Sequence, residues 1–118
     1  YDIYKAFEFI KISEADYSLD YRIVSYINRH ISDDISVRRL CEKFFISESQ
    51  LRRIFKRATA STVGDYITVK RLVKARSLIL SGTSPTRAYL QCGFKDYSVF
   101  YRAYKKKYGT SPSKISIG

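Results

Sequence analysis

Apolar residues recur every three or four positions in two short stretches of the chain, residues 47–56 and 96–105. Both stretches read Ser or Asp, x, Ser, x, Leu or Phe, x, Arg, x, Phe or Tyr, and Lys, where x is any residue. Each matched position in the second stretch lies 49 residues after its counterpart in the first. This spacing predicts two helices whose apolar side packs inward, while Ser, Arg and Lys face a partner.

A helix-turn-helix unit is predicted around the first stretch, at residues 36–58. Ser36 is the expected N-cap of a short helix over 37–44. After a tight turn, Ser47 opens the second helix, and Gln50 three residues later completes a capping box. A short helix, a turn and a second helix of about ten residues form the helix-turn-helix pattern.

A helix over 20–30, with Asp20 or Ser18 as its N-cap, is predicted to pack on this unit. His30, next to its C-terminal end, is expected at the surface beside the helix dipole. The residues expected to face inward in this part are Ile23, Val24, Ile27, Ile31, Val37, Leu40, Cys41, Phe44, Leu51, Ile54, Phe55 and Ala58.

The second half of the chain predicts a long helix, then a second helix-turn-helix unit at 84–108. The long helix runs over 63–80 and is apolar on more than one side, as expected of a helix that contacts units on two sides. Ser84 followed by Pro85 is a strong signal for a helix start. In the last helix the expected inward residues are Val99, Phe100, Ala103 and Tyr104.

The expected fold is therefore all-α, with two helix-turn-helix subdomains joined by a long linker helix and about seven helices. Tyr1 stands where a complete chain would begin with Met, so we expect a fragment of a longer protein. The expected segments are 1–18, a linker or helix from an upstream domain; 19–61, the first subdomain; 62–82, the connecting helix; 83–113, the second subdomain; and 114–118, a tail.

Charge is distributed unevenly along the chain. Residues 1–32 carry four Lys and Arg against five Asp and Glu, a net charge of −1, whereas residues 33–118 carry 18 against six, a net charge of +12. A basic region that coincides with the repeated helices is the electrostatic footprint of a polyanion binder. The alternative to a polyanion binder is a basic surface whose only role is to keep the protein soluble.

The types and spacing of the chemically active residues exclude several other classes of protein. Cys41, Cys92 and the single His30 have no metal-site spacing, so the two thiols are interpreted as small buried groups. The chain shows no catalytic Ser/His/Asp set, carboxylate pair or phosphate loop, so we expect neither an enzyme nor a cofactor. No run of about 18 apolar residues predicts a membrane span.

The spacing of many positions over about residues 20–113 resembles the C-terminal DNA-binding domain of AraC/XylS-type transcription regulators. The residues that carry the resemblance are Leu40, Cys41, Ser47, Ser49, Leu51, Arg53, Phe55, Lys56, Tyr66, Ile67, Arg71, Leu72, Ala75, Gly93, Phe94, Ser98, Phe100, Arg102, Lys105, Lys106, Gly109, Ser111 and Pro112. The chain departs from the family pattern at Pro85, Ala88 and Tyr89, where aliphatic or small residues are usual.

The resemblance implies sequence-specific binding of double-stranded DNA by a monomeric domain, with both recognition helices in successive major grooves. It implies base contacts by Ser49, Arg52, Arg53, Tyr97, Ser98, Tyr101 and Arg102. The expected phosphate contacts are Ser47, Lys56, Arg71, Lys95, Lys105 and Lys106. The second unit offers only Arg102 and aromatic residues to base edges, so we expect it to discriminate less sharply than the first.

The family's usual role is activation of transcription through contact with RNA polymerase, although some members repress. A bacterial regulator of this kind is expected in the cytoplasm at the nucleoid, with dimerisation through an upstream domain. The alternative function is a non-specific nucleic-acid-binding module, in which the tyrosines would stack on bases.

Overall fold

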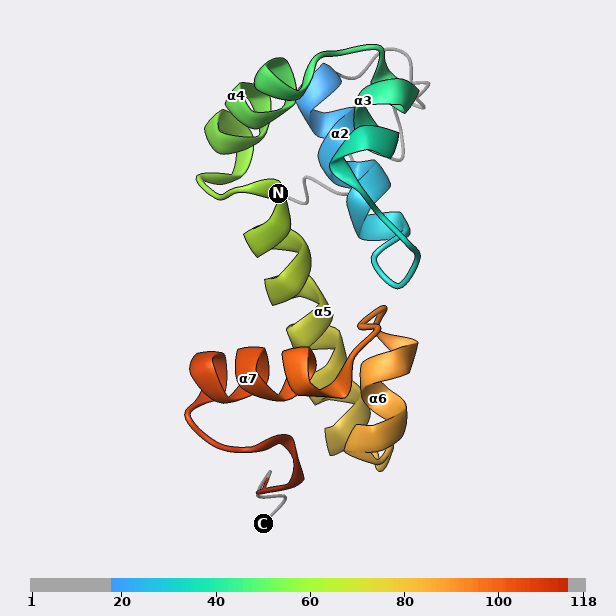
Figure 1. The fold of residues 1–118 in the computed structure, drawn as a ribbon, viewed down its shortest axis with the longest axis vertical. Coiled ribbons are helices and arrows are strands. Elements are labelled where there is room, and N and C mark those ends of the chain that lie inside the picture. The colour runs from blue at the N-terminus through green and yellow to red at the C-terminus, as the bar shows by residue number, and fades with distance from the viewer. Residues whose placement is uncertain (1–17, 115–118) are drawn as a thin grey trace, which may run out of the picture.

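The computed structural model describes residues 18–114, and every regular element in that range is helical (Figure 1). The predicted helix near the N-terminus and the last residues of the predicted tail lie outside this range. The all-α prediction is confirmed. The elements are α2 (Leu19–Arg29), α3 (Val37–Phe44), α4 (Glu48–Thr59), α5 (Val63–Leu80), α6 (Pro85–Gln91), α7 (Tyr97–Tyr108) and the 3-10 turn η2 (Pro112–Lys114).

The helix starts lie where the capping residues predict them. Ser36 Oγ accepts the Arg39 N–H at 3.2 Å and begins α3. Ser47 and Gln50 form the reciprocal capping box of α4, with distances of 3.1 and 2.8 Å. At α2 the N-cap is Ser18 rather than Asp20, whose carboxylate lies in the first turn.

The turn between α3 and α4 is held in an uncommon backbone conformation. Phe45 has φ of 56°, in the left-handed region, and the backbone N–H of Ile46 donates to Cys41 O at 3.2 Å. The Phe45 side chain is 92% exposed. A residue with a β-carbon disfavours this conformation, so this turn carries a local conformational cost.

The first hydrophobic core lies between α2, α3, α4 and the N-terminal half of α5. Its buried residues are Ile23, Ile27, Leu40, Leu51, Phe55, Val63 and Ile67. The prediction of Ala58 as an inward residue was wrong, because Ala58 is exposed. The buried line of α4 continues from Phe55 by one turn to the half-buried Thr59, whose hydroxyl donates to Phe55 O at 2.9 Å.

The second core lies between the C-terminal half of α5, α6 and α7. Its buried residues are Leu72, Ala75, Ile79, Ala88, Cys92, Phe94, Phe100 and Tyr104. Val99, predicted to face inward, is 48% exposed, because the buried line of α7 passes through Phe100 and Tyr104. Tyr89 is accommodated beside the fully buried Ala88, with its ring centroid 6.0 Å from that of Phe100 in a stacked arrangement.

The long helix α5 contributes to both cores and separates them, as its two-sided apolar pattern predicts. Figure 1 shows the first subdomain at one end of α5 and the second subdomain at the other. In that view α4 and α7 lie to the left of α5, whereas α3 and α6 lie to its right. The second helix of each unit is thus placed on the same side of the molecule. Among residues 18–114 no helix is both long and apolar enough to cross a bilayer.

Candidate nucleic-acid interface

Four polar side chains form one exposed face of α4. Ser49, Arg52, Arg53 and Lys56 follow one another at helical spacing, and all four are exposed. Leu51 and Phe55 hold the opposite side of the helix in the first core. The buried pair therefore fixes the rotation of α4 and presents the polar face to solvent.

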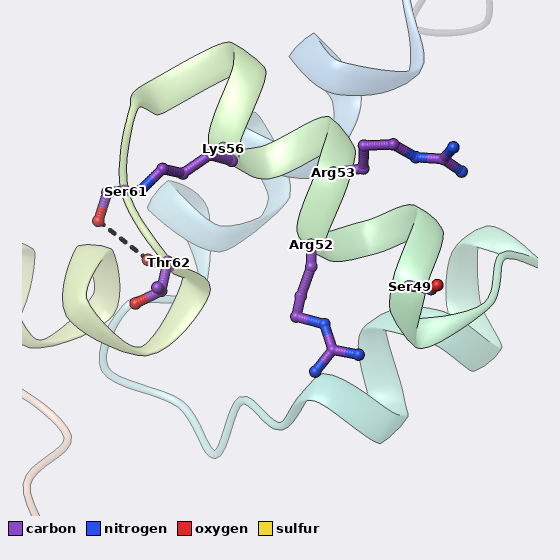
Figure 2. A pocket seen from close by; sticks show the side chains of 6 residues that line it. All are labelled: Ser49, Arg52, Arg53, Lys56, Ser61 and Thr62. Atoms are coloured by element: carbon purple, nitrogen blue, oxygen red, sulfur yellow. Dashed lines mark hydrogen bonds between the residues drawn. The ribbon is translucent and has the colours of Figure 1, made fainter.

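A shallow surface hollow adjoins this face, and Figure 2 shows the six side chains that line it. Arg52 and Arg53 leave α4 in different directions, while Lys56 extends toward Ser61, just before α5. Arg52 lies 3.7 Å from Glu48 one turn earlier, whereas no ion pair within residues 18–114 uses Arg53. Ser61 and Thr62 were not predicted as site residues; Thr62 is the N-cap of α5, where its hydroxyl accepts the Asp65 N–H at 3.1 Å, so α5 starts directly after α4.

The corresponding face of α7 repeats this arrangement. Ser98, Tyr101, Arg102 and Lys105 each lie 49 residues after their counterparts in α4. Ser98, Arg102 and Lys105 are exposed, and Tyr101 is half-buried. Asp96 caps the helix by accepting the Ser98 N–H at 2.7 Å, so the exposed serine stands at the first turn of α7. The repeat in the sequence is thus a repeat of two exposed helix faces.

Tyr97, one of the expected base contacts, is half-buried at the edge of this face, with its ring centroid 6.3 Å from that of Tyr101. Its ring packs against the second core, with centroids 5.2 Å from Tyr89 and 5.7 Å from Phe100. The counterpart of Tyr97 by the repeat is Glu48, at the first position of α4. Its position therefore favours a packing role for this tyrosine.

Two of the expected phosphate contacts are engaged within the protein. Arg71 is half-buried, and its Nε and Nη2 donate to the carbonyl oxygens of Ile31 and Asp33, each at 2.8 Å. Lys95 Nζ lies 3.2 Å from Asp34 Oδ1. Both side chains reach from α5 or the second subdomain to the loop between α2 and α3. Both cations therefore have partners within the protein, which compete with any contact to phosphate.

The remaining expected phosphate contacts are exposed. Lys56 and Lys105 end the two polar faces, and Lys106 follows in the last turn of α7. Ser47 Oγ accepts a hydrogen bond from the Gln50 N–H, which leaves its hydroxyl hydrogen for a further acceptor.

The described residues offer no alternative centre of metal chemistry. No group of three or more His, Cys, Asp or Glu side chains within residues 18–114 could hold a metal ion. Cys92 is fully buried, and burial raises the pKa of its thiol, so a reactive thiolate is disfavoured. The exposed chemistry of α4 and α7 consists of hydroxyl, guanidinium and ammonium groups, which are donors suited to nucleic acid.

Known proteins similar to this chain include transcription regulators. A family model described as a helix-turn-helix domain matches residues 40–116. The probable transcriptional regulator LumQ of Photobacterium leiognathi is 36% identical over 96 residues, covering 80% of this chain and 39% of LumQ. The transcriptional activator RhaS of Escherichia fergusonii is 31% identical over 109 residues, covering 89% of this chain and 39% of RhaS. The chain spans 39% of the length of each of these relatives.

Solved structures with the same fold include DNA-binding domains. A probable AraC family transcriptional regulator from Rhodopseudomonas palustris aligns with a TM-score of 0.69 at 27% identity, over 82% of this chain and 94% of that chain. The DNA-binding domain of AdpA, solved with a target DNA, aligns with a TM-score of 0.77 at 20% identity, over 81% of this chain and 87% of that chain. The helix-turn-helix match covers most of the chain, and it includes both exposed helix faces. The chain therefore belongs to the AraC-type family of helix-turn-helix transcription regulators, as a DNA-binding domain of that family.

Proposed function

We propose that this domain binds double-stranded DNA in a sequence-specific manner, with α4 and α7 in two successive major grooves. The observation that carries the proposal is the repeated face: Ser49, Arg52, Arg53 and Lys56 on α4, and their counterparts on α7. In a helix-turn-helix unit the second helix enters the major groove. Here both second helices expose a hydroxyl, an Arg and a Lys along one side.

The dimensions of the molecule agree with this mode of binding. Successive major grooves on one face of B-DNA lie about 34 Å apart. The longest dimension of the molecule is 44 Å, and α4 and α7 belong to opposite ends of it on the same side of α5 (Figure 1). One protein chain thus has the length to span one turn of DNA.

The side chains suggest a division of labour between the two units. In the first unit, Ser49, Arg52 and Arg53 would contact base edges, since Arg makes bidentate hydrogen bonds to guanine. In the second unit, Ser98, Tyr101 and Arg102 would do so, with fewer donors and more apolar contact. The proposed phosphate contacts are Ser47, Lys56, Lys105 and Lys106. We expect the first unit to supply most of the base specificity.

The proposed biological role is regulation of transcription in a bacterium, at the chromosome. Activation through contact with RNA polymerase is the favoured form, since RhaS is named an activator. The domain would bind as a monomer, and an upstream domain would allow the whole protein to dimerise.

The first test is selection of bound sites from random duplex DNA, followed by measurement of affinity for every single-base variant of the selected site. Arg53→Ala should remove about 1–3 kcal/mol of preference at one or two base pairs. Lys106→Ala should weaken binding to all duplexes alike. Arg38→Ala on α3, which removes the same charge as Arg53→Ala from outside the proposed base-reading face, should leave the base preference unchanged.

Two outcomes would contradict the proposal. Equal affinity for the selected site and for random duplex at the same salt concentration would favour the non-specific nucleic-acid module. A larger loss of base preference from Arg102→Ala than from Arg52→Ala and Arg53→Ala would reverse the proposed division of labour.

A further inference from the structure

The loop between α2 and α3, residues 31–34, bonds to side chains of α5 and of the second subdomain. Arg71, near the middle of α5, donates from Nε to Ile31 O and from Nη2 to Asp33 O, each at 2.8 Å. Lys74, one turn later, donates to Ser32 Oγ. The loop belongs to the first subdomain, whereas Arg71 and Lys74 lie at the level of the second core. These hydrogen bonds therefore connect the two subdomains. Together with the contacts of Gly93 and Lys95 described in the next paragraph, we call them the clasp.

The turn between α6 and α7 contributes the remaining contacts of the clasp. Gly93 there has φ of +96°, and a β-carbon added to it would lie 2.9 Å from Arg71 Nε and 3.0 Å from Ile31 O. Only a residue without a side chain allows the α6–α7 turn to approach so closely. Lys95, two residues later, lies 3.2 Å from Asp34 Oδ1. Arg71 is thus held between the loop of one subdomain and the turn of the other.

The clasp braces a part of the molecule that neither hydrophobic core covers. On α5 the last buried residue of the first core is Ile67, and the first buried residue of the second core is Leu72. Between them the two subdomains are linked by the helix itself and by the clasp. Figure 1 shows the loop between α2 and α3 descending toward the turn between α6 and α7, beside this part of α5. A bend of α5 there would change the relative position of α4 and α7.

We infer that Arg71 is a positioning residue, which holds α4 and α7 at one separation and angle and so makes DNA binding depend on the spacing between the two half-sites. This inference rests on the proposed function. The guanidinium is suited to the role because its planar fork donates to two carbonyl oxygens at once, and it keeps its charge when partly buried. A lysine at this position would offer a single nitrogen and could not reproduce the two bonds in the same geometry.

The experiment measures spacing preference directly. The selected site is compared with duplexes in which one or two base pairs are inserted or deleted between the half-sites. Each base pair moves one half-site by about 3.4 Å along the DNA and about 35° around it. The wild-type domain should bind the native spacing more tightly than every shifted one. The spacing ratio is the affinity for the native spacing divided by the affinity for a shifted spacing. In Arg71→Gln the spacing ratio should fall by about tenfold, the effect of losing a charge-assisted hydrogen bond.

The matched control is Lys70→Gln, which removes the same charge from the adjacent residue, whose ammonium lies over the Tyr66 ring. It should keep the wild-type spacing ratio. Affinity for a duplex with the first half-site alone should be the same in Arg71→Gln and Lys70→Gln, which shows that the first unit remains folded. Asp34→Asn, which loses the ion pair with Lys95 and keeps the side-chain shape, should lower the spacing ratio in the same direction.

An unchanged spacing ratio in Arg71→Gln would overturn the inference, and so would an equal loss in Lys70→Gln. If Arg71→Gln fails to fold, the Asp34→Asn ratio decides: a wild-type value refutes the role of the clasp. Failure of the proposed function has a different signature, since the wild-type domain would then show no preference for the selected site over random duplex.

Discussion

Replacing Phe55 by Ala is the most direct test of the rotation of α4. Phe55 is 1% exposed and anchors the first core, where its ring meets the Tyr66 ring edge-on at a centroid distance of 5.2 Å. Truncation of a buried Phe to Ala costs about 3–5 kcal/mol, because the lost apolar contacts are accompanied by a cavity. A small domain has a total stability of about 5–15 kcal/mol, so this change should remove a large part of it.

Phe45 supplies a matched control in the same helix-turn-helix unit. Phe45→Ala deletes the same atoms from a side chain that is 92% exposed, and Ala keeps the backbone restrictions of a residue with a β-carbon. Its free energy of unfolding should change by no more than about 0.5 kcal/mol. The substitution is the same in both variants, so the difference between their free energies of unfolding measures the effect of burial.

The measurement is urea unfolding followed by far-ultraviolet circular dichroism, together with the thermal midpoint. A loss of 3 kcal/mol or more should lower the midpoint by more than about 12 °C in a domain of this size. If Phe55→Ala unfolds at the same urea concentration as Phe45→Ala, Phe55 does not anchor the core. The polar face of Ser49, Arg52, Arg53 and Lys56 would then be misassigned as well, since the buried side determines which side is exposed.

Three further predictions concern salt, backbone strain and pH. Binding to the selected DNA should weaken with a log–log slope of about −3 against salt, because the three proposed lysine contacts to phosphate, Lys56, Lys105 and Lys106, release counterions; a slope near zero would exclude nucleic acid. Phe45→Gly should raise the free energy of unfolding in urea by about 0.5–1 kcal/mol, since glycine relieves the left-handed turn; a decrease would mean that the Phe45 ring stabilises the fold. The hydrogen bond and charge of Lys95, with the charges of Arg39 and Arg71, lower the pKa of Asp34. The difference in thermal midpoint between wild type and Asp34→Asn should therefore be constant above about pH 5 and disappear as the pH falls through the depressed pKa; a difference that persists there would contradict it.

The helices of this domain could be predicted from local signals, since the residues that begin them act over three or four positions. Ser36, Ser47 and Thr62 each accept a backbone N–H at the helix start that their sequence context predicts. The organisation into two units followed from the 49-residue repeat and from the two-sided apolar pattern of the long helix. Helix rotation was less predictable at the ends of the apolar stripes. Ala58 and Val99 are small or aliphatic residues beside the buried line, and only tertiary packing determines which side of it is covered.

The site could be predicted only where it depends on a repeated local pattern. The exposed faces of α4 and α7 follow from the 49-residue repeat. Arg71 was expected to contact phosphate because it is a cation on a helix. In the structure its guanidinium donates to two backbone carbonyl oxygens about 40 positions earlier, at Ile31 and Asp33. Every residue type has a backbone carbonyl oxygen, so the sequence does not indicate which carbonyl accepts a hydrogen bond. This contact therefore could not be predicted from the sequence.

The division of the two cores along the chain has a consequence for biosynthesis. The buried residues of the first core lie between Ile23 and Ile67, and those of the second between Leu72 and Tyr104. Domains generally fold as units during synthesis, with the N-terminal one first. The first core can therefore close while the second half of the chain is still within the ribosome. The loop at Ile31 is then in place before Gly93 emerges, so the growing second subdomain assembles against a surface that has already formed.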